Sequence, residues 1–528
     1  MRPSSRFRPP KPRDITEYLR SCFRIDTRSL ACFRIGLGLL IVADMLLRAR
    51  NFGFYYIDGG IVPAELAARH TTDNAVSVYF LVGDANAIAA LFVIQALVGL
   101  ALAAGYRTRA VAIASFLFVV SLDHHNPFVL SYADTLFRLL LFWAIFLPLG
   151  ERYSVDAVRS TGTPRETVGG PIAAVALLQM VFMYVLNGVH KLESELWRSG
   201  EATVLVFGID EMTFLIGDFV RQYPTALEYG GLLWFYMLLT AWLLVLLPGR
   251  PRVAFLSLFI GGHASFAVTV RIGAFAYVAI AGLLLFLPAV FWRDLDSVLE
   301  RTGIDSTVDR IRPRLRSLAD RLPPLGSVPA RYAAIGAAVQ TVAVAAVVVA
   351  LALVISIAAF NAGAVVTDDG YDQRALNDAV SDHPAGTYVH TAAESVGVTQ
   401  PEWSVFAPHP RTTDRYYVFG ARTVDGEKLD VYNHRPFAWD RPHDGALQRQ
   451  HGTYRHRFLM NSVRRSDPGD ELPANLGEHI CRSYADRGVE LRHISMFEVT
   501  ERITEDTVTD PGSRDTERTH IDRHVCGE

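Results

Sequence analysis

Long apolar runs separated by short polar stretches dominate the first 360 residues of the chain. A helix needs about 18 or more apolar residues to cross the hydrocarbon core of a bilayer, and most of these runs reach that length. The predicted spans are residues 30–47, 86–104, 108–122, 131–149, 171–191, 230–248, 253–270, 273–292 and 332–360. The pattern therefore predicts an all-α polytopic membrane protein with about nine transmembrane helices. Between the fifth and sixth spans, residues 204–220 are typical of an amphipathic helix lying at the interface.

Beyond residue 362 the pattern changes from long helical runs to shorter, mixed elements. β-rich runs alternate with turns, and a helical stretch separates them from a later strand, which favours a small α+β domain. The segments concerned are residues 416–419, 429–432, 447–488 and 494–499. We accordingly divide the chain into a basic arm (1–29), a membrane domain (30–362), an α+β domain (363–503) and a polar tail (504–528), which we expect to be loosely held.

Basic residues gather in alternate connections between the predicted spans. Cytoplasmic connections are enriched in Lys and Arg, so this alternation tests both the span count and the orientation. The basic segments are 1–29, 107–109, 152–165, 250–252 and 293–331. Nine spans with a cytoplasmic N-terminus place all five on the cytoplasmic side. The sequence thus predicts a multi-pass protein of the cell membrane with an extracytoplasmic C-terminal domain.

Composition and charge narrow the function class. Half of the residues are hydrophobic and the mean hydropathy is +0.21, which is too apolar for an ordinary soluble enzyme. The part after residue 361 has about nine more acidic than basic side chains, which argues against a nucleic-acid partner. None of the four cysteines has zinc-ligand spacing, and we expect no metal site. In an extracytoplasmic domain Cys481 and Cys526 could form a disulfide, although sequence alone cannot show that they are close enough.

The fifth predicted span ends in an unusual group of polar residues. Tyr184, Asn187 and Lys191 are spaced i, i+3 and i+7, so they share one helix face, and His190 lies in the same turn. Lysine occurs only at positions 11, 191 and 428, whereas nearly every other cation is arginine. An amine can give up its proton when it is removed from water, but a guanidinium cannot. Two interpretations stay open: a snorkelling lysine at the membrane interface, or a catalytic base.

Further ionisable residues fall in the outer half of the predicted spans. Asp134 and Arg138 are spaced i, i+4 and could neutralise each other in a low dielectric. His263 lies in the middle of the seventh span and is either a hydrogen-bonded packing residue or a functional one. Because intramembrane charges normally face the bundle interior or a water-filled cavity, these residues suggest a shared pocket that opens outward.

Several short motifs, in the same order along the chain, resemble the vitamin K-dependent gamma-carboxylase family. They are most similar to its prokaryotic relatives, the horizontally transferred transmembrane (HTTM) domain proteins. The motifs are Arg34-Ile-Gly-Leu-Gly, Tyr56-Ile-Asp58-Gly59-Gly60-Ile-Val-Pro63, Asp134-Thr-Leu-Phe-Arg138, Tyr153-Ser-Val-Asp156, Gly188-Val-His190-Lys191-Leu192, His263 with Ile272-Gly273-Ala-Phe275-Ala-Tyr277, and Trp403-Ser-Val-Phe406-Ala-Pro408.

The resemblance implies a chemistry for Lys191. In the carboxylase, the lysine of the matching Lys-Leu pair takes a proton from vitamin K hydroquinone. Oxygen then adds, and the strong base that results removes a γ-proton from a protein glutamate, whose carbanion captures CO2. Taken together, the shared helix face, the polar layer and the resemblance make Lys191, His190 and Asn187 the catalytic candidates. The substrate-binding candidates are Tyr184, His263, Asp134, Arg138 and Asp58.

The implied co-reactants are a reduced quinone, O2 and CO2, without a metal, and the implied partners are the lipid bilayer and a secreted protein or peptide. Two departures from the family pattern bear on carboxylation. The catalytic Asn-His pair of the carboxylase aligns with residues 132–134, which read Tyr-Ala-Asp here, and the tail is shorter. A non-catalytic membrane scaffold or a small-solute carrier is the alternative, although a carrier would more often show inverted repeats.

Overall fold

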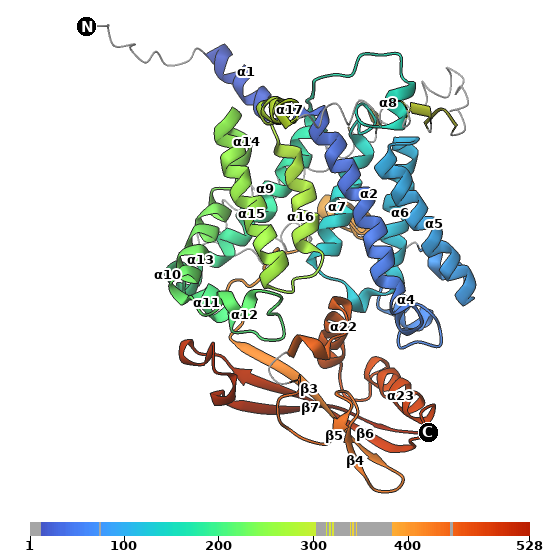
Figure 1. Cartoon of the computed structure of the whole chain (residues 1–528). Coiled ribbons are helices and arrows are strands. Elements are labelled where there is room, and N and C mark those ends of the chain that lie inside the picture. The colour runs from blue at the N-terminus through green and yellow to red at the C-terminus, as the bar shows by residue number, and fades with distance from the viewer. Residues whose placement is uncertain are drawn as a thin grey trace.

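The computed structural model describes residues 12–302, except 73, 74 and 76, and residues 383–527, except 444–446, together with ten positions between 313 and 345. Apart from four positions, the predicted span 332–360 lies outside the described residues. The described part forms a helical bundle with an α+β domain stacked on one of its ends (Figure 1).

Four bundle helices are long and apolar enough to cross a membrane, judged by length and composition within the described residues. They are α2 (Thr27–Ala49), α5 (Ala85–Ala104), α9 (Pro171–Leu192) and α15 (Gly249–Thr269). A fifth candidate joins α16 (Phe275–Leu283) and its 3-10 extension to α17 (Ala289–Thr302), with a bend of 99°. The fold is thus that of a membrane-embedded helical bundle with four to five candidate spans.

Shorter helices complete the bundle and its connections. They are α1 (Pro12–Cys22), α3 (Phe52–Tyr55), α4 (Ala64–Arg69), α6 (Thr108–His125), α7 (Tyr132–Phe146), α8 (Val155–Arg159), α10 (Glu195–Ser199), α11 (Glu201–Phe207), α12 (Gly217–Val220), α13 (Pro224–Leu239) and α14 (Leu243–Leu246). A two-residue strand, β1 (Ile25–Asp26), pairs with β2 (Thr167–Val168). The helices α2 and α5 pack at close range, because a Cβ atom at Gly38 would lie 2.5 Å from the carbonyl oxygen of Gly99.

One helix prediction is wrong in this region, and one predicted span is interrupted. The predicted amphipathic helix 204–220 is instead α11 and α12, separated by a loop, because the backbone N–H groups of Asp210 and Glu211 donate to the carboxylate of Asp414 at 2.9 and 3.1 Å. The predicted span 230–248 is divided into α13 and α14. At the break, the Thr240 hydroxyl donates to the Tyr236 carbonyl at 2.6 Å, a back-bond that is known to bend helices.

The C-terminal domain is built on a five-stranded antiparallel sheet of order β5-β4-β3-β6-β7. Its strands are β3 (Thr413–Thr423), β4 (Lys428–Asp430), β5 (Arg435–Pro436), β6 (Leu491–Arg502) and β7 (Thr516–Val525). The helices α22 (Tyr454–Arg465) and α23 (Glu471–Ala485) lie between this sheet and the bundle (Figure 1), and α21 (Pro384–Ser395) precedes the sheet in sequence. One face of the sheet therefore packs on helices and the other points away from the bundle.

The expectation of a loosely held tail after residue 503 is wrong. β7 pairs with β6 from Thr516 to Val525, and Arg514 is buried. Cys526 forms a disulfide with Cys481 of α23, with a Cα–Cα distance of 5.8 Å. An edge strand that alternates mostly polar residues gives little apolar periodicity, so the pattern concealed it.

Candidate functional site

A cavity of about 590 Å³ lies among α9, α11, α13 and α15 and is bordered by a segment of the C-terminal domain, residues 402–406, which we call the capping segment. Four of the residues predicted from sequence line it: Tyr184, Asn187, Lys191 and His263. Trp403, Val405 and Phe406 of the capping segment line it as well. Most of the remaining lining is aliphatic, aromatic or glycine, so the cavity suits an apolar ligand with a few polar groups.

Lys191 is buried at this cavity, with 2% of its surface exposed. Its Nζ donates to the carbonyl oxygen of Val405 at 2.7 Å and to that of Phe406 at 3.4 Å, and lies 4.0 Å from the centroid of the Trp197 ring. No carboxylate among the described residues lies within ion-pair distance of it. The amine thus has hydrogen-bond acceptors and an aromatic face around it but no counter-ion, and its open side is the cavity.

Asn187 and His190 hold the capping segment against α9. The amide nitrogen of Asn187 donates to the carbonyl oxygens of Trp403 at 2.6 Å and Val405 at 3.1 Å, and Nε2 of His190 lies 2.9 Å from the carbonyl oxygen of Glu402. Trp403 and Phe406 have φ values of 52° and 53°, which are unfavourable for side chains with a Cβ. These hydrogen bonds stabilise that backbone, so Asn187 and His190 position the carbonyls that surround Lys191.

Tyr184 and His263 form a second polar point on the cavity wall. The Tyr184 hydroxyl lies 2.8 Å from Nε2 of His263, and both side chains are buried. The other ring nitrogen of His263, Nδ1, is buried without a hydrogen-bond partner among the described residues. Buried polar atoms are normally satisfied, so this nitrogen is available to a polar group of a ligand in the cavity.

The remaining predicted residues lie elsewhere. Asp58 accepts a hydrogen bond from the backbone N–H of Ala64 at 3.1 Å, and neither it nor Asp134 nor Arg138 is among the residues that line the cavity. The predicted pairing of Asp134 with Arg138 is wrong. Asp134 instead completes the capping box of α7 with Ser131, which turns its carboxylate toward the helix N-terminus.

Asp134 and Arg138 belong to a buried network of three carboxylates and three arginines. Asp134 accepts from Arg455 of α22 at 2.9 Å, Arg138 pairs with Asp123 at 3.2 Å, and Arg48 bonds Asp123 at 2.8 Å. Asp44 completes the network through Arg48 and Arg455. Because Arg455 belongs to the C-terminal domain, the network fastens that domain to α2, α6 and α7.

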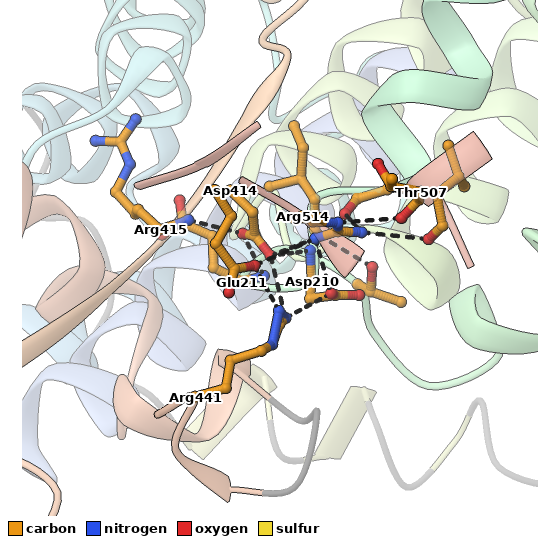
Figure 2. Close-up of polar contacts among 12 residues, drawn as sticks. Asp210, Glu211, Asp414, Arg415, Arg441, Thr507 and Arg514 are labelled. Carbon is orange, nitrogen blue, oxygen red and sulfur yellow. Dashed lines mark hydrogen bonds and ion pairs between the residues drawn. The ribbon is translucent and has the colours of Figure 1, made fainter. Parts of the chain in front are cut away.

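A second set of ion pairs joins the same domain to the loop after α11. Figure 2 shows that Asp210 of this loop, Asp414 of β3, Arg441 and Arg514 point toward one another. The backbone N–H of Glu211 joins the group by donating to Asp414. Arg441 bonds Asp210 at 2.5 Å, and Arg514 lies 3.2 Å from Asp210 and 3.3 Å from Asp414. Burial alone would raise the pKa of Glu211, but Arg411 and Arg457 hold that pKa well below its usual value.

The sequence patterns alone did not predict that Trp197 and the capping segment contact Lys191. The segment's motif was recognised in the tail, yet its carbonyls reach an amine more than 200 positions earlier, with sequence separations of 214 and 215. Trp197 donates from Nε1 to the Phe406 carbonyl at 2.8 Å and thus completes the surroundings of the amine. The clue in the sequence was the positional match of these motifs to a known family.

Comparison with known proteins supports that match. The HTTM domain matches residues 23–291, just over half of the chain, and this region contains α2 through α16 and the cavity-lining helices. No curated protein and no solved structure shows significant similarity to the chain. Given the extent of the match, this chain belongs to the HTTM domain family.

Proposed function

We propose that the protein is a membrane enzyme in which Lys191 acts as a base on a lipid-soluble substrate, of which a reduced quinone is the leading candidate. The observation that carries the proposal is the geometry of Lys191: a buried amine that has no carboxylate partner among the described residues and opens onto a largely apolar cavity. An amine removed from water and left without a counter-ion is disposed to give up its proton, as a general base requires.

The walls of the cavity indicate how such a substrate would reach Lys191. Three of the residues that line the cavity are also exposed on the outside of the bundle. They are Leu233 of α13, which is 52% exposed, Leu258 of α15, which is 45% exposed, and Ile216 just before α12, which is 51% exposed. Gly230 and Gly261 line the same side and leave room between the two helices. In a bilayer, this side faces acyl chains, so access from the lipid is the natural route.

The two polar points of the cavity would orient the substrate. One substrate hydroxyl would lie at Nζ of Lys191, and a second oxygen would bind Nδ1 of His263, whose ring is held by Tyr184. After proton transfer, the new ammonium would be stabilised by the carbonyls of Val405 and Phe406 and by the Trp197 ring. Carboxylation of a secreted protein or peptide, with O2 and CO2 as co-reactants, is the version that the family resemblance favours.

We place the cavity toward the outer side of the cell membrane, in a chain of nine spans with a cytoplasmic N-terminus. The alternating basic connections support this orientation. The helices α1 and α8, which belong to the basic segments 1–29 and 152–165, lie at the end of the bundle opposite the C-terminal domain (Figure 1). The disulfide between Cys481 and Cys526 suits an oxidising compartment for that domain.

The test is reconstitution of the full chain in lipid nanodiscs with a reduced quinone, O2 and labelled bicarbonate. The readouts are oxygen-dependent loss of reduced quinone, followed by absorbance, and transfer of label to a glutamate peptide. Lys191→Arg should lower the first rate by about 100-fold or more, because it keeps the charge but cannot act as a base. Lys11→Arg makes the same chemical change in the basic arm and should leave the rate unchanged. Equal rates for wild type and Lys191→Arg would refute the role of the base.

A further inference from the structure

The face of the C-terminal sheet that points away from the bundle contains a hollow of about 380 Å³. The opposite face packs on α22, where Arg415 bonds Asn461 and the Tyr417 hydroxyl lies 3.4 Å from the Met460 carbonyl. Strand residues alternate between faces, so the paired residues Gly420–Ser495 and Arg422–His493 lie on the outward face. We call this surface the outer sheet face.

Aromatic side chains form the floor of the hollow. The ring centroids of Phe437 and Trp439 are 5.2 Å apart, and those of Trp439 and Phe497 are 5.0 Å apart. Gly420 allows the Phe437 ring to lie directly on β3, because a Cβ atom there would be 2.7 Å from the ring. The result is an apolar trough between β4 and β6, bordered by strands whose outward side chains are not covered by the helices.

The charges around this trough are predominantly positive. Arg422, Lys428 and His493 line the hollow, and the guanidinium of Arg518 lies 4.3 Å from the centroid of Trp439. Among the described residues, Arg422, Lys428 and Arg518 form no ion pair. Burial and the charges of Arg523, Arg422 and Arg492 lower the pKa of His493, which reflects the same excess of positive charge.

Three carboxylates at outward positions of β3, β4 and β6 are paired with arginines. Asp414 and Glu501 pair with Arg441 and Arg514, and Asp430 pairs with Arg435 at 3.1 Å. The outer sheet face therefore presents unpaired cations beside an apolar trough, although the chain after residue 361 is acidic overall. This local excess of positive charge, next to an apolar trough, is complementary to a peptide in which carboxylate side chains alternate with apolar ones.

We propose that the outer sheet face binds an extended, acidic peptide segment. Its carboxylates would pair with Arg422, Lys428 and Arg518, and its alternate apolar side chains would lie in the trough of Phe437, Trp439 and Phe497. A lipid headgroup fits less well, because this face points away from the bundle (Figure 1). A nucleic acid fits less well because the surrounding domain would repel its phosphates. The claim that this peptide is a substrate rests on the proposed function. The claim that it binds to the outer sheet face does not.

The test uses the full chain in nanodiscs and a fluorescent peptide of alternating glutamate and leucine, with binding followed by anisotropy. Combining Arg422→Ala, Lys428→Ala and Arg518→Ala should weaken binding by about tenfold or more. The matched control combines Arg465→Ala, Arg482→Ala and Arg487→Ala, which remove the same charge from exposed positions on or just after α22 and α23 and should change affinity less than about twofold.

Lys191→Met should bind the peptide like the wild type, which separates failure of this surface from failure of the proposed base. The proposal is overturned if the glutamate-leucine peptide does not bind, or if both triple variants weaken binding equally. It is also overturned if a glutamine-leucine peptide binds as tightly, because carboxylates would then not be needed. Equally tight binding of a single-stranded oligonucleotide would overturn it too, because the surface would then bind polyanions in general.

Discussion

Lys191 is deeply buried and has no ion-pair partner in the described part of the chain, which is a costly arrangement for a folded protein. Two backbone carbonyls and one indole ring replace the water that the amine loses. Removing a group of this kind from water costs several kcal/mol, and a functional requirement is the usual reason for retaining it. We therefore expect that replacing Lys191 increases the stability of the protein but removes its activity.

Lys191→Met should raise the stability of the ligand-free protein by about 1 kcal/mol while it abolishes activity, because methionine fills a similar volume without a polar head. Thermal unfolding in detergent measures the change, and Lys428→Met at the exposed lysine is the control. A clearly lower unfolding temperature for Lys191→Met would show that the hydrogen bonds of the amine outweigh its desolvation cost.

Asn187 is the second residue whose role can be isolated. Asn187→Leu should destabilise the protein by about 2 kcal/mol, because two backbone carbonyls of the capping segment lose their donor. The half-buried His190 makes one bond to this segment, so His190→Ala should cost less than about 1 kcal/mol. Limited proteolysis between residues 398 and 408 is the second readout, with faster cleavage expected for Asn187→Leu. Equal protection of both variants would contradict the anchoring role.

At the scale of elements, strongly apolar helices could be predicted and elements shaped by distant partners could not. The predicted spans 30–47 and 171–191 correspond to α2 and α9 within three residues at each end. In contrast, the loop that replaces the helix predicted over 204–220 exists because Asp414, some 200 residues later, accepts its backbone N–H groups. Likewise, Arg455 of α22 takes the place of Arg138 beside Asp134. Local periodicity contains no information about such partners.

His456 of α22 makes the unfolding free energy of the chain sensitive to pH. Burial, together with the charges of His451 and Arg271, lowers the pKa of His456 to about 3, while its Nε2 lies 3.1 Å from the Tyr432 hydroxyl. The unfolded chain binds a proton near pH 6.5, where the native state does not. The stabilisation is therefore fully present above pH 6.5 and is lost as the pH falls, by at most about 1.4 kcal/mol per pH unit.

His456→Gln should accordingly flatten the fall in unfolding free energy between pH 7 and pH 5, because glutamine does not titrate. The measurement is thermal or chemical unfolding of the full chain at several pH values in that range. Wild type and variant share His451, whose pKa is also lowered by burial, so the difference between their slopes isolates His456. Parallel slopes would mean that His456 is protonated in the folded state.

At the scale of the whole molecule, the C-terminal domain completes a site that the membrane helices begin. Two buried ion-pair networks fix this domain on the bundle, and the capping segment places its carbonyls at Lys191. The sequence allowed Tyr184, Asn187, Lys191 and His263 to be proposed, because they lie on apolar helices where polar groups are conspicuous. It could not show that the tail closes the site, since that contact joins segments more than 200 residues apart.

Chemical rescue tests the central claim, that the Lys191 amine is a base, most directly. Lys191→Ala leaves space beside the cavity, and its activity is followed as oxygen-dependent loss of reduced quinone in nanodiscs. We predict that ethylamine restores turnover, that more basic amines of similar size restore it faster, and that ethanol does not restore it. Full activity of Lys191→Ala without any amine, or equal rescue by ethylamine and ethanol, would contradict the account.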